Sequence, residues 1–112
     1  MREVIAVDFD GTLCENKHPE IGDVLPIHER VHELIRVKHK NGALIILWTC
    51  RCGPELEAAI SFCRKNDIPI DLVNENDPER VKKYGYDSRK ISADLYIDDK
   101  AIGWNLAEAI LG

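Results

Sequence analysis

Four short runs of apolar residues are spaced along the chain, and each is continuous rather than alternating with polar residues. They occupy residues 4–7, 43–48, 70–73 and 95–97. Continuous apolar runs of this length are typical of parallel strands that are buried on both faces of a sheet. The pattern therefore predicts a parallel sheet of about four strands.

The segments between these runs carry apolar residues at helical spacing. Residues 27–40 and 53–66 each present one apolar face, and each is bounded by residues that start or stop helices. A short helix is expected over 78–84, after the capping residue Asp77. A last helix is expected over about 102–111, with a buried side formed by Leu106, Ala109 and Ile110.

This alternation of strands and helices predicts an α/β fold. We expect a doubly wound, three-layer, Rossmann-like parallel sheet in a single domain that spans residues 1–112. Residues 11–26 interrupt the alternation, because they hold two glycines and two prolines with few periodic apolar positions. A loop of this length in a small domain is usually functional, so this segment is interpreted as a flap beside the site.

Charge and cysteine content indicate which partners and which cellular compartment to expect. The chain carries 15 basic and 20 acidic residues, a net charge of −5, which argues against nucleic acid as the main partner. No signal peptide is expected, and no apolar stretch of the sequence approaches the ~20 residues of a membrane helix. The four cysteines lack paired metal-binding spacing, so reduced thiols in a cytoplasmic protein are expected.

Polar residues that could perform chemistry follow three of the predicted strands. Parallel strands end at one edge of their sheet, so these residues are expected to converge there. They are Asp8 and Asp10, Thr49 and Arg51, and Asp98 and Asp99, with Lys90 in the loop before the last strand.

Several carboxylates at one edge require a cation. Two unit charges 4 Å apart repel by about 1 kcal/mol in water and by about 4 kcal/mol at an effective dielectric constant of about 20. Oxygen ligands combined with a substrate phosphate suit Mg²⁺ better than zinc. The sequence therefore predicts a magnesium site built from Asp8, Asp10, Asp98 and Asp99.

The same residues suggest phosphoryl transfer. A carboxylate at a strand end, Asp8, can attack phosphorus and form an aspartyl phosphate. Asp10, two residues further on, can protonate the leaving oxygen and later activate water. Thr49 can hold a phosphoryl oxygen, and Lys90 can supply positive charge where negative charge develops.

Four segments resemble, in order, the motifs of the haloacid dehalogenase superfamily of phosphohydrolases. They are DFDGTL at 8–13, LIILWT at 44–49, Lys90, and LYIDD at 95–99, so the resemblance extends over nearly the whole chain. The resemblance implies Asp8 as the nucleophile, Asp10 as the general acid and base, and Thr49 and Lys90 as phosphate-holding groups. It implies Mg²⁺ on Asp8, the backbone carbonyl of Asp10, and Asp98, with Asp99 bound directly or through water.

The chain differs from many members of that superfamily because it leaves little room for a cap domain. Residues 11–26 and 50–89 are too short for one, so a small capless phosphomonoester hydrolase is expected. An open site could accept a phosphate on a large molecule. A neighbouring subunit in a homo-oligomer could instead close the site over a small phosphorylated molecule.

Two other functions fit the same fold. One is a receiver-like phosphoacceptor, although the third predicted strand carries no aspartate at its end. The other is a non-catalytic phosphate-binding protein, which would have no need of Asp10. Two residue roles also remain open. Arg51 could bind a phosphate or a substrate carboxylate, or only solvate its loop, and Arg89 or Lys100 could replace Lys90.

Overall fold

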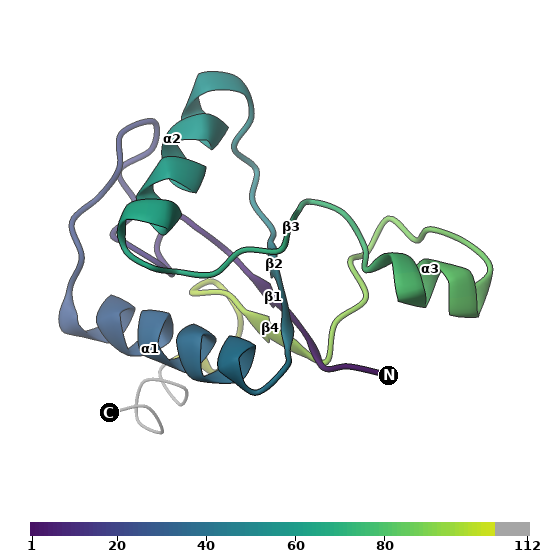
Figure 1. Cartoon of the computed structure of the whole chain (residues 1–112). Coiled ribbons are helices and arrows are strands. Elements are labelled where there is room, and N and C mark those ends of the chain that lie inside the picture. The colour runs from purple at the N-terminus through teal and green to yellow at the C-terminus, as the bar shows by residue number, and fades with distance from the viewer. Residues whose placement is uncertain (105–112) are drawn as a thin grey trace.

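A four-stranded parallel sheet forms the centre of the molecule, which is described here for residues 1–104 from a computed structural model (Figure 1). The strand order is β3-β2-β1-β4, and every neighbouring pair is parallel. The strands are β1 (Val4–Val7), β2 (Leu44–Leu47), β3 (Leu72–Val73) and β4 (Leu95–Ile97). The predicted α/β, Rossmann-like fold is confirmed, and the described residues contain no cap domain.

Three helices lie where the apolar periodicity predicts them, within one residue at either end. They are α1 (Pro26–Lys40), α2 (Gly53–Lys65) and α3 (Pro78–Tyr84). Asp77 caps α3 by accepting a hydrogen bond from the Glu79 N–H at 3.0 Å. Gly85 ends α3 with a φ of 84°, a left-handed conformation that a side chain would disfavour. The helix expected over 102–111 falls almost entirely outside the described residues.

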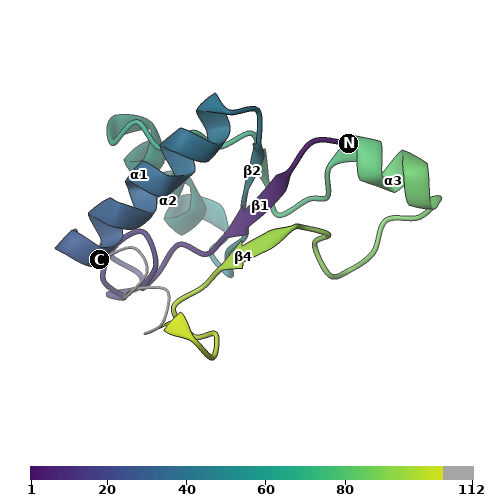
Figure 2. The ribbon, with the colours of Figure 1, turned by 90° about the horizontal axis from the view of Figure 1, so that it is seen from below.

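The two faces of the sheet are covered differently. Alternate residues of β1 and β2, such as Ile5 and Ile45, pack with α1 and α2 in the larger core cluster. Val4 and Ile46 point to the other face, where they cluster with Ile91 from the segment that follows α3. The helix α3 itself lies beside the amino terminus, away from α1 and α2 in both views (Figures 1 and 2).

The strand register brings the carboxyl ends of β1, β2 and β4 together. Val7 pairs with Leu47 on one side and with Ile97 on the other. The Asp8 N–H continues the ladder by donating to the Ile97 carbonyl at 2.9 Å. The residues that follow these three strands therefore start from neighbouring positions.

The cysteines and the helices bear on two further expectations, reduced thiols and the absence of a membrane helix. All four cysteines are free thiols. Within residues 1–104, every helix is too short or too polar to cross a membrane.

Candidate active site

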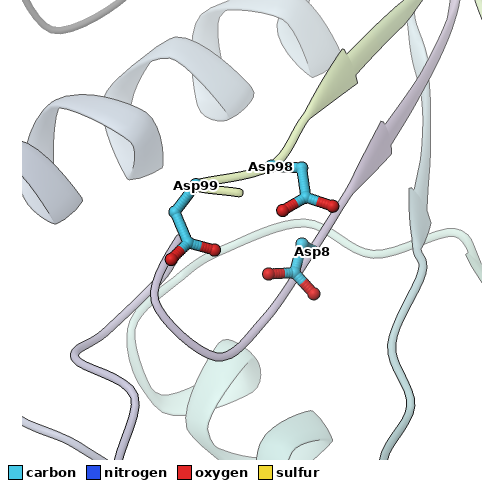
Figure 3. A group of neighbouring side chains, drawn as sticks. All are labelled: Asp8, Asp98 and Asp99. Carbon is cyan, nitrogen blue, oxygen red and sulfur yellow. The ribbon is translucent and has the colours of Figure 1, made fainter. Parts of the chain in front are cut away.

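Three carboxylates meet where β1 and β4 end. Asp8 follows β1, Asp98 and Asp99 follow β4, and their side chains point toward one another (Figure 3). One oxygen from each can be chosen so that all three lie within 4.8 Å of one another. Three converging carboxylate oxygens suit a hard divalent cation, so the donor set fits the predicted Mg²⁺.

The Thr12 side chain connects two of these acids. Its hydroxyl oxygen lies 3.2 Å from Asp8 Oδ2 and 3.3 Å from Asp99 Oδ1, so its single proton can be donated to either carboxylate. The same oxygen accepts a hydrogen bond from the Asp99 backbone N–H at 3.0 Å. Thr12 is fully buried, and it therefore fixes the spacing of the loops that follow β1 and β4.

Gly11 permits this close approach. Its φ is 89°, and a Cβ atom at this position would lie 2.2 Å from Asp99 Oδ2. Any other residue would collide with one of the clustered carboxylates. Thr12 and Gly11 follow Asp10 directly in the sequence, yet only the fold reveals that both of them contact Asp99.

Burial changes the pKa of the Asp8 carboxyl group. It raises the pKa of this carboxyl group to about 7, and the charges of Asp98 and Asp99 act in the same direction. The hydrogen bond from Thr12 opposes this shift but does not overcome it. Asp8 is therefore a carboxyl group whose ionisation is sensitive to positive charge placed beside it.

Asp10 has a different environment from the three clustered acids. Its Oδ2 accepts from Arg51 Nε at 2.8 Å, and its Oδ1 accepts from Arg51 Nη2 at 2.7 Å. This two-point contact fixes the plane of the carboxylate. The Asp10 side chain belongs to this ion pair, whereas the group of three possible ligands contains Asp8, Asp98 and Asp99.

Arg51 is held by more than Asp10. Its Nη1 donates to the carbonyls of Pro19 and Glu55, at 3.0 and 3.2 Å, and its Nη2 also donates to the Glu20 carbonyl at 2.8 Å. The guanidinium carbon lies 5.0 Å from the centroid of the Phe9 ring. Arg51 is 2% exposed, and these contacts use all five of its N–H groups.

This environment favours a structural role for Arg51 over a contact with substrate. A guanidinium with every N–H group engaged has none left for a phosphate or a substrate carboxylate. In this arrangement Arg51 instead joins Asp10 to the start of α2 and to the flap (residues 11–26). The sequence gives no signal for this role, because three of its five hydrogen bonds end on backbone carbonyls.

Thr49 faces the same cleft as Asp8 and Asp10. Its hydroxyl oxygen accepts from the Arg51 N–H at 3.1 Å, which leaves its own proton free to be donated. Asn74 holds the Thr49 backbone through two hydrogen bonds, at 2.8 and 3.0 Å. The side-chain amide of Asn74, which follows β3, is thus used to hold the Thr49 backbone, which follows β2.

The cleft has a volume of about 370 Å³ and receives residues from four segments. Asn16 and His18 come from the flap, and neither was expected to contribute to the site from the sequence. The complete lining is Asp8, Asp10, Asn16, His18, Thr49, Cys50, Arg51, Asp98 and Lys100.

Two lysines lie near this end of the sheet in different settings. Lys100 lines the cleft, whereas Lys90 is absent from that lining. The Lys90 ammonium lies 5.2 Å from the centroid of the Tyr96 ring. Tyr96 pairs with Ala6 in the ladder, and these residues are two positions before Asp98 and Asp8. Strand alternation therefore puts Lys90 on the sheet face to which both acids project.

Comparisons with known proteins identify one useful structural relative. No protein-family model matches the sequence, and no match is found among curated proteins. A solved structure described as a conserved protein coded by locus from Bacteroides thetaiotaomicron is 34% identical, with a TM-score of 0.77. The match covers 99% of this chain and 90% of that chain. The chain therefore belongs to the same family as this conserved protein of Bacteroides thetaiotaomicron.

Proposed function

We propose that the protein is a magnesium-dependent phosphomonoester hydrolase that acts through an aspartyl phosphate on Asp8. The observation that carries this proposal is the cluster of Asp8, Asp98 and Asp99, with ligand atoms within 4.8 Å of one another. The resemblance of its sequence motifs to the haloacid dehalogenase superfamily supports the same assignment. The four free cysteines fit a reducing compartment such as the cytoplasm.

Asp8, Asp98 and Asp99 would hold the Mg²⁺ ion. When bound, the ion would supply positive charge that screens the clustered acids and the phosphate. The pKa of Asp8 is raised to about 7 in the absence of a cation, and adjacent positive charge favours its ionised form. A carboxylate nucleophile has to be ionised, so the cluster and the proposed chemistry are mutually consistent.

The first chemical step is attack of an Asp8 oxygen on phosphorus. A P–O bond forms to Asp8, while the bond to the leaving alcohol breaks and its electron pair stays on the leaving oxygen. Asp10 donates a proton to that oxygen. Both Asp10 oxygens accept from Arg51, but each keeps a second lone pair that can carry or receive the proton.

The second step is hydrolysis of the aspartyl phosphate. Asp10 removes a proton from water, the water oxygen attacks phosphorus, and the bond to Asp8 breaks. Inorganic phosphate is released, Asp8 is again a carboxylate, and Asp10 again carries the proton that it donates in the first step. The Thr49 hydroxyl donates to a phosphoryl oxygen in both steps, and Lys90 is the proposed source of positive charge for the phosphate.

The test is hydrolysis of p-nitrophenyl phosphate with and without Mg²⁺, in the wild type and in Asp8→Asn. We expect turnover that requires Mg²⁺ and falls by about 10³-fold or more in the variant. Asp23→Asn is the matched control, because Asp23 is exposed and pairs with Lys17 in the flap. Absence of turnover over a panel of sugar, nucleotide and protein phosphomonoesters would contradict the proposal.

The two other functions give different results in the same experiments. A receiver-like phosphoacceptor would retain a stable phosphoryl group on Asp8 without catalytic turnover. A phosphate-binding protein would bind inorganic phosphate and form no covalent adduct. Mass spectrometry of the protein after mixing with substrate distinguishes both from an enzyme.

A further inference from the structure

A second polar cavity lies at the other end of the molecule from the carboxylates. It has a volume of about 220 Å³ and is bounded by α3 and by the loop that precedes β4. Asp94, at the end of that loop, donates its N–H to the carbonyl of Val4 at the start of β1, whereas Asp8 follows the end of β1. The cavity is therefore separate from the proposed active site.

Arg80 contributes a cation to this cavity. It is 7% exposed; Nη1 donates to Ser92 Oγ at 3.2 Å, and Nη2 contacts Asp94. Arg80 Nε has no hydrogen-bond partner, and no other buried side-chain nitrogen or oxygen in residues 1–104 lacks one. Nη1 and Nη2 each carry a second N–H group that makes no hydrogen bond within residues 1–104, and these two groups are suited to acceptors from a ligand.

The rim of the cavity is held in place by Asn76. Its amide nitrogen donates to Asp87 Oδ1 and to the Ser88 carbonyl, each at 2.9 Å. Its amide oxygen accepts from the Ser92 N–H at 2.6 Å. The loop that faces Arg80 is thus fixed from inside, and the cavity exists without a ligand.

Aromatic rings line the opening of the cavity. Arg80 is the one charged residue among the described residues that line it. Tyr84 and Tyr86 both line the cavity and are 55% and 68% exposed. Exposed tyrosine rings next to a cationic pocket are typical of sites for ligands that combine a phosphate with a flat ring.

We propose that this cavity binds a nucleotide, with its phosphate on Arg80 and its base against Tyr84 and Tyr86. The phosphate oxygens accept hydrogen bonds from the second N–H groups of Arg80 Nη1 and Nη2. The Arg80 guanidinium favours a negative ligand, and the two rings provide stacking surface. This site is independent of whether Asp8 is a nucleophile.

The experiment is a titration of the full chain with adenosine monophosphate, followed by NMR of backbone and arginine Nε–H groups in magnesium-free buffer. We expect the signals of Arg80 Nε–H and of the Ser88 and Ser92 amides to shift along one saturable curve. Adenosine alone and inorganic phosphate alone should each bind about tenfold more weakly, because each lacks half of the contacts.

Substitutions of residues that line the cavity test whether adenosine monophosphate binds there. Arg80→Gln should abolish the response at Ser88 and Ser92, and Arg64→Gln, an exposed arginine on α2, should leave it unchanged. Arg80 also holds Asp94, so the variant could lose stability. The exposed pair Tyr84→Ala and Tyr86→Ala provides a second test, with affinity for adenosine monophosphate expected to fall about tenfold.

Three results would overturn the proposal. One is a wild-type Arg80 Nε–H signal that does not move with millimolar adenosine monophosphate. Another is equal affinity for inorganic phosphate and adenosine monophosphate, which would leave no role for the rings. The third is unchanged affinity in the double tyrosine variant.

Discussion

At the scale of single residues, Arg51 is the side chain with the widest influence on the proposed site. It holds both oxygens of Asp10 while it binds carbonyls of the flap and of α2. Its effect on catalysis would act through Asp10, so Arg51 is a positioning residue. Lysine cannot reproduce this role, because its ammonium makes no planar two-point contact with a carboxylate.

Arg51→Lys should therefore lower kcat of the proposed reaction by about tenfold or more while KM changes little. The measurement is steady-state kinetics with p-nitrophenyl phosphate, with Arg64→Lys on the exposed side of α2 as the control. A rise in KM at constant kcat would instead mean that Arg51 binds substrate. Unchanged kinetics would remove it from the site altogether.

Lys90 and Lys100 give a second prediction at this scale. Lys90 lies on the sheet face to which Asp8 and Asp98 project, whereas Lys100 is an exposed residue that lines the cleft. Lys90→Ala should reduce kcat by about 10²-fold, because it removes charge next to the reacting phosphate. Lys100→Ala should mainly raise KM. The reverse pattern in the kinetics would assign the catalytic role to Lys100.

At the scale of elements, α3 is anchored to the amino-terminal segment through a buried acid. Asp77 caps the helix and also accepts from Arg2 Nη2 and Nε, at 2.9 and 3.2 Å. The hydrogen bond from Arg2 is the main reason that the pKa of Asp77 is lower than usual. A lowered folded-state pKa stabilises the protein at neutral pH, and this stabilisation is lost as the pH falls below about 4.

Asp77→Asn should consequently reduce the free energy of unfolding at pH 7. The loss should be only about 1 kcal/mol, because Arg2 is exposed and solvent weakens its ion pair with Asp77. The difference from the wild type should shrink in acid, where the wild-type carboxylate is protonated as well. Urea denaturation at both pH values measures it. Glu79→Gln, which changes an exposed acid 3.7 Å from Arg2, should have little effect at either pH.

The elements were also the most predictable level of structure. Helix bounds followed from local signals, such as Pro78 after Asp77 and Gly85 after Tyr84, and the strands followed from buried apolar runs. The convergence of Asp8 with Asp98 and Asp99 followed from parallel topology. The partners of Arg51, Thr12 and Lys90 could not be predicted, because they depend on loop conformation and on side-chain reach rather than on periodicity.

At the scale of the whole molecule, mutual repulsion among Asp8, Asp98 and Asp99 opposes the folded state unless a cation is bound. Binding of Mg²⁺ should therefore raise the melting temperature, by about 6 °C when its concentration is about tenfold above Kd. Asp98→Asn should reduce this increase. Differential scanning fluorimetry over a magnesium series provides the measurement, with Asp23→Asn as the control.

The outcome also tests the proposed metal site separately from catalysis. A melting temperature that does not respond to Mg²⁺, in a protein that remains folded, would contradict a magnesium site at this cluster. A response of equal size in Asp98→Asn would mean that the ion binds elsewhere.

The position of β4 at the edge of the sheet has a consequence for how the site is assembled. Two of the three clustered acids follow this strand, while the third follows β1, 90 residues earlier. During synthesis, the cluster cannot form until the ribosome has released residue 99. An edge strand also opens more readily than a central one, so amide hydrogen exchange in β4 should slow when the ion binds. Loss of metal and detachment of the last strand would then be a single event.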